Sequence, residues 1–307
     1  MTAAVLDTDI TAPKKKSWLR LHTVEAWLLL LPSIVLFATF THIPIIQTAI
    51  DSFYSTPRGI RPSRFVGWDN YIDMNADPIF WKAFINNMIY ALGTIPLSIA
   101  LALAMALFVN GKIAGRGLLR MAYFTPTVLP MIAVANIWLF FYTPDYGLVD
   151  QVARVFGFGA TNWLGSQKTA LYAIMVVTVW KEAGFFMIFY LAALQQMSPD
   201  LREAAEIEGA SAFTFFRRIT WPLLMPVTLF VLVNAVINAF RTIDHIFVMT
   251  GGGPDNATNV LLYRLYEIGF KFWDQGQATA LTMVLLIMLS LLALMQFVMA
   301  GRKVHYQ

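Results

Sequence analysis

Six long apolar stretches constrain the fold of this chain more than any other feature. About 20 consecutive apolar residues at helical rise cross the hydrocarbon core of a bilayer, and six segments reach that length. They cover residues 26–50, 83–109, 118–142, 170–194, 222–249 and 276–299. Six such lengths exceed what the core of an ordinary soluble protein holds. The sequence therefore predicts an all-α membrane protein with six transmembrane helices.

The composition agrees with this class. Hydrophobic residues make up 58% of the 307 residues and charged residues only 13%, against about 25% charged in soluble domains. The first stretch, 26–50, is too long for a signal peptide, so we expect a retained first helix. Within the third stretch, Pro126 and Pro130 are expected to kink the helix.

The distribution of Lys and Arg predicts an orientation. If the N-terminus is cytoplasmic, the inner segments hold Lys14, Lys15, Lys16, Arg20, Lys112, Arg116, Arg120, Arg202, Arg217, Arg218, Arg302 and Lys303. The outer segments then hold Arg58, Arg61, Arg64, Lys82, Arg154, Lys168, Arg264 and Lys271. The excess on the inner side favours cytoplasmic N- and C-termini.

Several function classes are disfavoured by residues that the sequence lacks. The chain has no cysteine, which excludes disulfides and thiolate metal sites. Its four histidines show no metal-ligand spacing, and no basic patch is interleaved with aromatic residues as nucleic-acid binding requires. Gly111 and Lys112 are followed by Ile113, so no phosphate-binding loop of the G-x-x-x-x-G-K-[ST] type is present. We therefore expect no catalytic residue, metal, cofactor or nucleic acid for this chain.

The segment between the fourth and fifth stretches, residues 198–222, has the pattern of two short helices. Ser198 is a favoured N-cap residue, followed by a proline that fits the first helical position. Gly209 suits the end of this helix, because glycine adopts the left-handed conformation readily. Ser211 is expected to cap a second short helix that ends before Trp221. In the predicted orientation this pair lies on the cytoplasmic face.

The spacing within this loop matches a known pattern. Its key positions are Glu203, Ala204, Ala205, Gly209, Ile219 and Pro222. This arrangement resembles the EAA loop of binding-protein-dependent ABC importer permeases. After the fifth stretch, Asp244 is followed by the run Met249, Thr250, Gly251, Gly252, Gly253 and Pro254. That run is similar to the carbohydrate branch of the family, which includes maltose-type and glycerol-phosphate-type permeases.

The resemblance implies one permease subunit of an ATP-driven importer, a multi-pass protein of the bacterial inner membrane. The permease domain would cover residues 26–299, between cytoplasmic tails over 1–25 and 300–307. The implied partners are a second homologous permease, two copies of an ATP-binding subunit, an extracytoplasmic solute-binding protein and membrane lipid. The loop over 198–222 would be the coupling element that docks on the ATPase. ATP and magnesium would be used by that ATPase and not by this chain.

Polar residues inside two predicted spans are candidates for a solute pathway. A charge near the bilayer centre costs about 2.5–3.5 kcal/mol on insertion scales, so it needs a partner or a water-filled cavity. The candidates are Trp180, Lys181 and Glu182 in the fourth stretch, and Asn234, Asn238, Arg241, Asp244 and His245 in the fifth. Four of the five candidates in the fifth stretch recur at i, i+4, i+7 and i+11, which predicts one shared helical face.

Two interpretations of these residues stay open. They line a passage for a polyhydroxylated solute, with Trp180 stacking on a sugar ring, or they join helices within the bundle. Arg241 either binds an anionic group or pairs with Asp244, about one turn away. Asn86 and Asn87, in the second stretch, are expected to pack between helices. The outer Gly-Gly-Gly-Pro turn is either a plain loop or a contact for the binding protein.

The predicted function is passage of a sugar or related polyol through a pore shared with a partner permease. The alternative substrate is an anionic polyol, such as glycerol phosphate or another acidic sugar derivative. An ion-coupled secondary transporter is disfavoured, because an EAA-type loop serves no purpose without an ATPase. An intramembrane enzyme would need an acid–base or metal constellation that is not apparent in the sequence.

Overall fold

The computed structural model describes residues 18–57, 59–111, 113–157 and 161–301. Residues 1–17 of the predicted N-terminal tail and 302–307 of the predicted C-terminal tail lie outside this description. The chain divides into two units, with the boundary after Ile50. The first unit is one helical rod made of α1 (Trp18–Phe37), a π-helical turn η1 (Ala38–His42) and α2 (Ile43–Asp51). Its segment Thr23–Asp51 is long and apolar enough to cross a membrane, which confirms the first predicted span.

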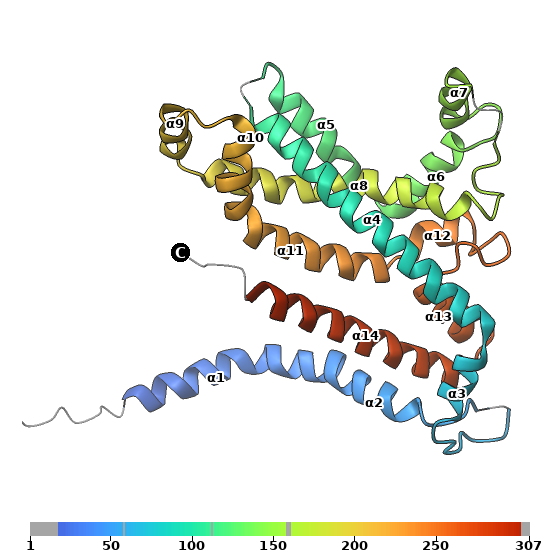
Figure 1. The fold of residues 1–307 in the computed structure, drawn as a ribbon. Helices are drawn as coiled ribbons and strands as arrows, with labels where there is room; N and C mark the ends of the chain where they lie inside the picture. Colours follow the sequence, from blue (N-terminus) through green and yellow to red (C-terminus); the bar gives the residue numbers. More distant parts are fainter. Residues whose placement is uncertain (1–17, 58, 112, 158–160, 302–307) are drawn as a thin grey trace, which may run out of the picture. The chain divides into compact units, whose positions relative to one another are not determined.

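The second unit, which begins at Asp51, contains four more candidate spans (Figure 1). Three of them contain α4 (Pro78–Asn110), α8 (Ala170–Gln196) and α14 (Gln275–Gly301). The fourth runs over Ala212–Met249 and consists of α10 (Ala212–Phe215), η2 (Phe216–Thr220), α11 (Trp221–Phe240) and α12 (Asp244–Met249). The described residues form helices and no β-strand, apart from one isolated β-bridge between Tyr54 and Phe65. The predicted all-α class is confirmed.

The third predicted span is not a single straight helix. It is broken into α5 (Arg116–Val128) and α6 (Met131–Phe141), which meet at an angle of 104°. Proline lacks an N–H and disfavours helical geometry at the residue before it, and Leu129, before Pro130, is extended with ψ 137°. The break therefore lies at Pro130, whereas Pro126 stays inside α5. The expected kink is real but much sharper than a bent helix, and six spans result only if this pair counts as one.

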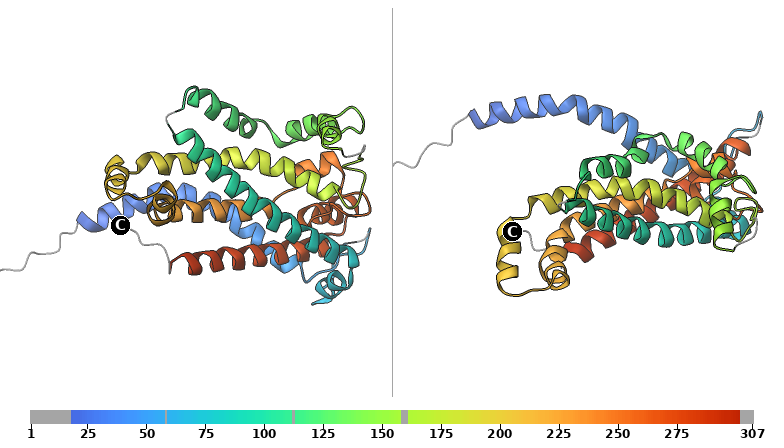
Figure 2. Two further views of the ribbon diagram at one scale, coloured as in Figure 1. Left: turned by 45° about the horizontal axis from the view of Figure 1, so that its top comes forward. Right: turned by 90° about the horizontal axis from the view of Figure 1, so that it is seen from above.

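Five short helical segments connect the spans. They are α3 (Asp69–Ala76), α7 (Leu148–Val155), α9 (Pro199–Ile207), α13 (Leu261–Tyr266) and η3 (Glu267–Lys271). Figures 1 and 2 show α9 and α10 at one end of the second unit, with α3, α7 and α13 at the opposite end. We call these the α9 end and the α3 end.

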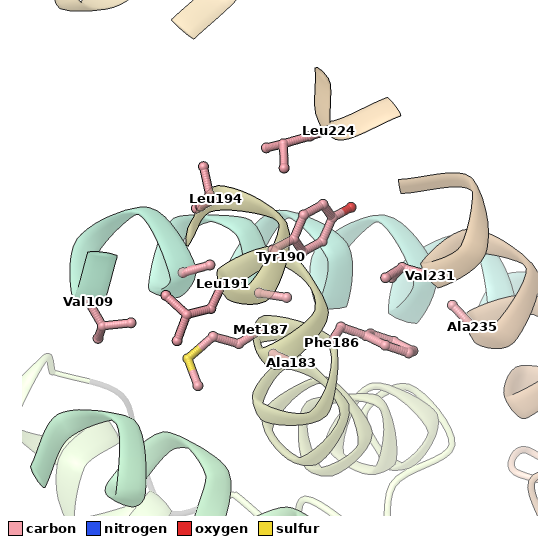
Figure 3. Packing of buried hydrophobic residues seen from close by; sticks show 12 residues of the cluster. Val109, Ala183, Phe186, Met187, Tyr190, Leu191, Leu194, Leu224, Val231 and Ala235 are labelled. Carbon is pink, nitrogen blue, oxygen red and sulfur yellow. The ribbon is translucent and has the colours of Figure 1, made fainter. Parts of the chain in front are cut away.

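The core of the second unit lies where α4 crosses α8, which is the most extensive helix contact in the chain. Small residues on α4, such as Ala102 and Ala106, let the two backbones approach, as is common between membrane helices. Phe186 and Tyr190 of α8 fill the space between α4 and α11 and are fully buried (Figure 3). The Tyr190 hydroxyl donates a hydrogen bond of 3.2 Å to Thr228 Oγ1. This packing fixes α8 as the central element against which the candidate site is built.

Candidate functional site

A polar cavity of about 340 Å³ lies between α6, α8 and the junction of α11 with α12. Its lining consists of Met131, Thr178, Lys181, Glu182, Asn238, Arg241, Thr242, Ile243, Asp244 and His245. Lys181 and Glu182 stand beside Ala183, the midpoint of the 27-residue helix α8. His245 and five of the seven other candidates for the pathway are thus brought together in this lining, although the sequence places the two groups about 60 residues apart.

Two predicted pathway residues lie outside this lining. Trp180 is not in the lining, and its ring lies edge-on to Trp138 of α6 at 5.6 Å between centroids. Asn234 donates a hydrogen bond of 2.8 Å to the Phe230 carbonyl one turn earlier on its own helix. Each stays a prediction as a solute contact, but neither shares the cavity with the other five.

The prediction of one continuous polar face in the fifth span is wrong, because the helix is interrupted. α11 ends at Phe240, and the Arg241 N–H is shared between the carbonyls of Ile237 and Asn238, both at 3.1 Å. Helix α12 starts three residues later, at Asp244. Arg241 and Asp244 are therefore exposed, while His245 turns into the core with 3% of its surface accessible.

The predicted pairing of Arg241 with Asp244 is not formed. Both residues belong to the described part of the chain, and no ion pair within 4.0 Å joins them. Both charges line the cavity instead.

Behind the cavity lies a buried hydrogen-bond cluster that the sequence analysis missed. The Tyr90 hydroxyl of α4 is 2.6 Å from Thr178 Oγ1 and 3.2 Å from His245 Nε2, and Thr178 Oγ1 is 3.0 Å from the same nitrogen. Thr242 Oγ1 approaches the Tyr90 hydroxyl at 3.3 Å. Buried polar groups in a membrane need hydrogen-bond partners. The hydroxyl groups of Tyr90 and Thr178, isolated in apolar stretches, were therefore the sequence signal that could have predicted this cluster. The cluster holds the start of α12 against α4 and α8.

Lys181 has a specific structural contact. Its ammonium group donates hydrogen bonds to the carbonyls of Pro126 at 3.0 Å, Thr127 at 3.4 Å and Leu129 at 2.6 Å. These carbonyls belong to the last turn of α5 and to the break after it, where helical partners are missing. A cation also interacts favourably with the negative end of a helix dipole. This contact supports the structural interpretation for Lys181.

The loop over 198–222 has the predicted caps. Ser198 Oγ accepts a hydrogen bond from Asp200 N at the start of α9, and Ser211 Oγ accepts one from Thr214 N at the start of α10. Between them Gly209 adopts φ +72°, which turns the chain sharply. The second helix does not end before Trp221 as predicted. Its backbone stays helical through the π-turn η2 and continues into α11, because Pro222 falls in the first turn of α11, where a proline costs no hydrogen bond.

The key positions of this loop are not equivalent in exposure. Glu203 and Ala204 face outward on α9, while Ala205 is buried against the ends of α4 and α8. Ile219 is half-buried in η2. Ile207 is 88% exposed and Phe213, on the second helix, is 70% exposed. Ile207 therefore presents an exposed apolar side chain outside the candidate spans, one turn after the outward-facing Glu203.

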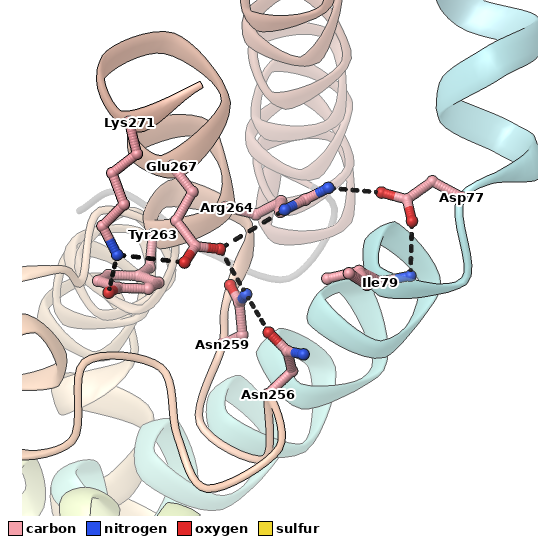
Figure 4. A network of polar contacts seen from close by, with 8 residues as sticks. All are labelled: Asp77, Ile79, Asn256, Asn259, Tyr263, Arg264, Glu267 and Lys271. Carbon is pink, nitrogen blue, oxygen red and sulfur yellow. Dashed lines mark hydrogen bonds and ion pairs between the residues drawn. The ribbon is translucent and has the colours of Figure 1, made fainter. Parts of the chain in front are cut away.

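At the α3 end, a charged network ties α4 to α13 (Figure 4). Arg264, only 8% exposed, donates to Asp77 at 2.9 Å and lies 3.6 Å from Glu267. Lys271 pairs with Glu267 at 3.3 Å and donates to the Tyr263 hydroxyl at 2.9 Å. This hydrogen bond, more than the nearby carboxylate, raises the pKa of Lys271, so the network keeps its positive charge.

The segment that follows the Gly-Gly-Gly-Pro turn is held by the two asparagines of α4. Asn86 donates to the carbonyls of Asn256 at 2.8 Å and Asn259 at 2.9 Å, and the Asn87 oxygen accepts from Leu261 N at 3.3 Å. The expectation that Asn86 and Asn87 serve packing is in keeping with these contacts. Within the described residues, no group of three or more His, Cys, Asp or Glu residues is placed to hold a metal ion.

Residues 78–303 match the family model of the binding-protein-dependent transport system inner membrane component. The chain belongs to this family. Its relatives include the trehalose/maltose transport system permease of Thermococcus litoralis, 33% identical over 92% of this chain and 94% of the relative. The sulfoquinovosyl glycerol transport permease of Agrobacterium fabrum is 33% identical over 89% of each chain. The sn-glycerol-3-phosphate transport permease of Yersinia pestis is 31% identical over 92% and 95%.

A solved structure has the same fold as this inner membrane component. A bacterial ABC transporter that imports the acidic polysaccharide alginate contains a chain that superposes with a TM-score of 0.82 at 22% identity, covering 94% of this chain and all of that one. A second structure, of a bacterial alginate ABC transporter in complex with a periplasmic protein that carries an alginate pentasaccharide, contains a chain that superposes with a TM-score of 0.82 at 21% identity. The relatives are named as transport permeases, which agrees with the expectation that this chain transports and is not an enzyme.

Proposed function

We propose that this chain is the permease subunit of an ATP-driven importer of a sugar or related polyol. The observation that carries the proposal is the mid-span cavity, which combines charged and amide side chains from three elements in a protein of this family. Such groups are costly in a bilayer unless they meet water or a polar solute. Carboxylate, guanidinium and amide groups together offer the donors and acceptors that hydroxyl groups need. The substrates named for the relatives support the same solute class.

The proposed complex contains a second homologous permease, two ATP-binding subunits and an extracytoplasmic binding protein. Family membership supports these partners, and so does the absence of a phosphate-binding loop in this chain. ATP and magnesium are assigned to the ATPase subunits. Both termini and the α9 end are assigned to the cytoplasm, following the bias of Lys and Arg.

The test is reconstitution in proteoliposomes with components encoded beside this chain. We expect sugar uptake only when both permeases, the ATPase, the binding protein and ATP are present. The purified chain alone should hydrolyse no ATP above background. Uptake by the two permeases without the ATPase, driven by an ion gradient, would instead identify a secondary transporter and refute the proposal.

The loop over 198–222 is proposed to dock on the ATPase through α9. The exposed Glu203, Ala204 and Ile207 support this role, together with the sharp turn at Gly209. No heavy atom lies within 4 Å of a Cβ added at Gly209, so its left-handed φ is the only obstacle to a side chain. Gly209→Val should therefore strain the turn by about 1–2 kcal/mol, while Gly209→Asn should be tolerated because asparagine visits this conformation.

We expect Gly209→Val to insert normally but to lose co-purifying ATPase and coupled uptake, and Gly209→Asn to retain most of both. Glu203→Lys should also weaken ATPase association, because it reverses an exposed charge on the first turns of α9. Its matched control is Lys168→Met, which removes an exposed charge in the loop before α8. Parental levels of ATPase association in both Gly209→Val and Glu203→Lys would show that α9 is not the docking helix.

A further inference from the structure

Two adjacent charges in the middle of α8 have different surroundings. Successive residues of an α-helix point about 100° apart, because 3.6 residues make a turn. Lys181 and Glu182 therefore face different neighbours, even though both reach the rim of the same cavity. Within the described residues the two side chains form no ion pair at 4.0 Å or less. The two charges therefore have separate contacts.

The ammonium group of Lys181 is fully hydrogen-bonded within the protein. A lysine ammonium has three N–H donors, and the Lys181 group meets three carbonyl oxygens, those of Pro126, Thr127 and Leu129. These carbonyls lie at the end of α5 and in the extended link to α6, where helical hydrogen bonding has stopped. The ammonium group therefore has no donor left for a solute while the break is intact.

A second feature of α8 fixes the same contact. Gly184, three residues after Lys181, lies on the same side of the helix. A Cβ atom at Gly184 would lie 2.0 Å from the Tyr123 carbonyl oxygen of α5. The missing side chain lets α8 approach α5 closely enough for Lys181 to reach the end of that helix. Lys181 and Gly184 together hold the break that immediately precedes Met131, the residue of α6 in the cavity lining.

The negative charge of Glu182, in contrast, interacts with Lys181 only through space and not as a direct ion pair. No Lys, Arg or His of the described residues lies within ion-pair distance of the Glu182 carboxylate. Its protein contact is the side-chain amide of Asn238, which lines the cavity with it. A carboxylate accepts up to about four hydrogen bonds, more than the one amide of Asn238 can donate, and Glu182 lies in the cavity lining. With Lys181 engaged, the charges that remain on the cavity wall are two acidic groups, Glu182 and Asp244, and one cation, Arg241.

We infer that this pair of charges is divided in function: Lys181 is a positioning residue that holds the break between α5 and α6, and Glu182 is a specificity-determining residue that accepts hydrogen bonds from hydroxyl groups of a neutral solute. The inference rests on the proposed function and names the solute class. A neutral polyol donates hydroxyl protons to the Glu182 carboxylate, whereas a phosphate or carboxylate on the solute is repelled by the excess of acidic groups. Arg241 then serves as a donor to hydroxyl oxygens.

The chain has no cysteine, so one engineered thiol is the single labelling site on this subunit, and its label is read on this subunit after the complex is separated on a denaturing gel. We choose Met131→Cys, at the first residue of α6 and in the cavity lining, and measure its maleimide labelling rate in the assembled complex. Lys181→Met should raise that rate severalfold because the break is released, Lys181→Arg should restore it in part, and Lys168→Met should leave it unchanged. An unchanged rate in Lys181→Met would overturn the positioning role.

The specificity role is tested by solute protection of the same thiol, which does not depend on the binding protein. The probes are a panel of neutral mono- and disaccharides, with sn-glycerol 3-phosphate as the anionic probe. For a protecting neutral sugar, Glu182→Gln should raise the half-protecting concentration about tenfold or more, the ordinary size of a lost charge-assisted hydrogen bond. Glu182→Gln should also improve protection by the anionic probe, whereas Lys181→Met should change both classes alike.

The outcomes separate this inference from the proposed function. Equal protection of the parent and Glu182→Gln by neutral sugars, or parental protection by the anionic probe alone, would overturn the role of Glu182 and leave the importer assignment standing. No protection by either class, together with no ATP-dependent uptake in proteoliposomes, would refute the proposed function and the inference with it. Normal recovery of both permeases in every variant shows that the differences do not arise from misfolding.

Discussion

Gly184 is the position where one added methyl group should do most to weaken the contact between α8 and α5. A Cβ atom there would lie 2.0 Å from the Tyr123 carbonyl oxygen, 3.2 Å from its carbonyl carbon and 3.3 Å from Thr127 Cγ2. The first two atoms are helix backbone and have no rotamer to escape into. Ordinary contact begins at 3.4 Å, so the two helices must separate locally by the difference, 3.4 minus 2.0, or about 1.4 Å.

Two costs add up when α8 and α5 separate. Overpacking a well-filled site costs about 1–3 kcal/mol. A shift of this size also stretches the Lys181 hydrogen bonds to the end of α5, and hydrogen bonds to charged groups contribute about 1.5–3 kcal/mol. Because part of the strain relaxes, we expect Gly184→Ala to destabilise this contact by about 2–3 kcal/mol, which is roughly a 30- to 140-fold change in its equilibrium constant.

The assay is thermal unfolding of the purified protein in detergent, followed by tryptophan fluorescence, with three glycine-to-alanine variants compared. Gly117, in the first turn of α5, has no heavy atom within 4 Å of an added Cβ, so Gly117→Ala should be neutral or slightly stabilising. At Gly93 the obstacle is the mobile end of Met175, so Gly93→Ala should fall between the other two. A midpoint for Gly184→Ala within error of that for Gly117→Ala would refute the reasoning.

Three further predictions concern the loops outside the candidate spans. Arg264→Met should leave the Asp77 carboxylate without its cation and Glu267 with Lys271 alone, and so destabilise the α3 end by about 2–4 kcal/mol, seen as a lower thermal midpoint that Arg264→Lys restores in part. Asn86→Ala should speed proteolytic cleavage within residues 250–260, since two carbonyls lose their donor. The third prediction concerns Asp150, whose pKa is lowered chiefly by the hydrogen bond from the backbone N–H of Thr161. Burial raises this pKa, but the Asp145 N–H and Arg154 add to the lowering, so the pKa stays below its ordinary value. The contribution of Asp150 to stability is therefore present above about pH 4 and lost as the pH falls through the lowered pKa, so pepsin cleavage in α7 should rise only below pH 4, and Asp150→Asn should abolish that step.

Sequence hydropathy predicted where the spans lie, because a run of about 20 apolar residues has the length needed to cross the hydrocarbon core of a bilayer. It did not predict how the third span breaks. Pro126 and Pro130 look alike in the sequence, yet only Pro130 ends a helix. The carbonyls freed at that break are bound by Lys181, which lies about 50 residues further along the chain. A break whose partners come from another helix is a tertiary property, and local propensity carries no signal of it.

The candidate site was predicted in composition but not in arrangement. A helical period applied to the fifth span places His245 in line with Arg241, provided that the helix is continuous. The interruption after Phe240 rotates the next turn, and His245 meets Tyr90 and Thr178 in the core instead. The cap residues of the loop over 198–222 were predicted correctly because Ser–Pro and glycine signals act within a few residues.

The middle of α8 illustrates how adjacent charges divide between structure and transport. One side of this helix meets the end of α5, where free carbonyls need a cation, and the next side meets the cavity, where hydroxyl groups need an acceptor. An ion pair between Lys181 and Glu182 would leave both needs unmet, because the ammonium would leave the carbonyls and the carboxylate would turn from the cavity. Exchanging the two residues, Lys181→Glu with Glu182→Lys, keeps the net charge but places a carboxylate against three carbonyls. If the two positions act as an ion pair, this exchange should be tolerated. If they act as inferred above, it should release the break and abolish solute protection together.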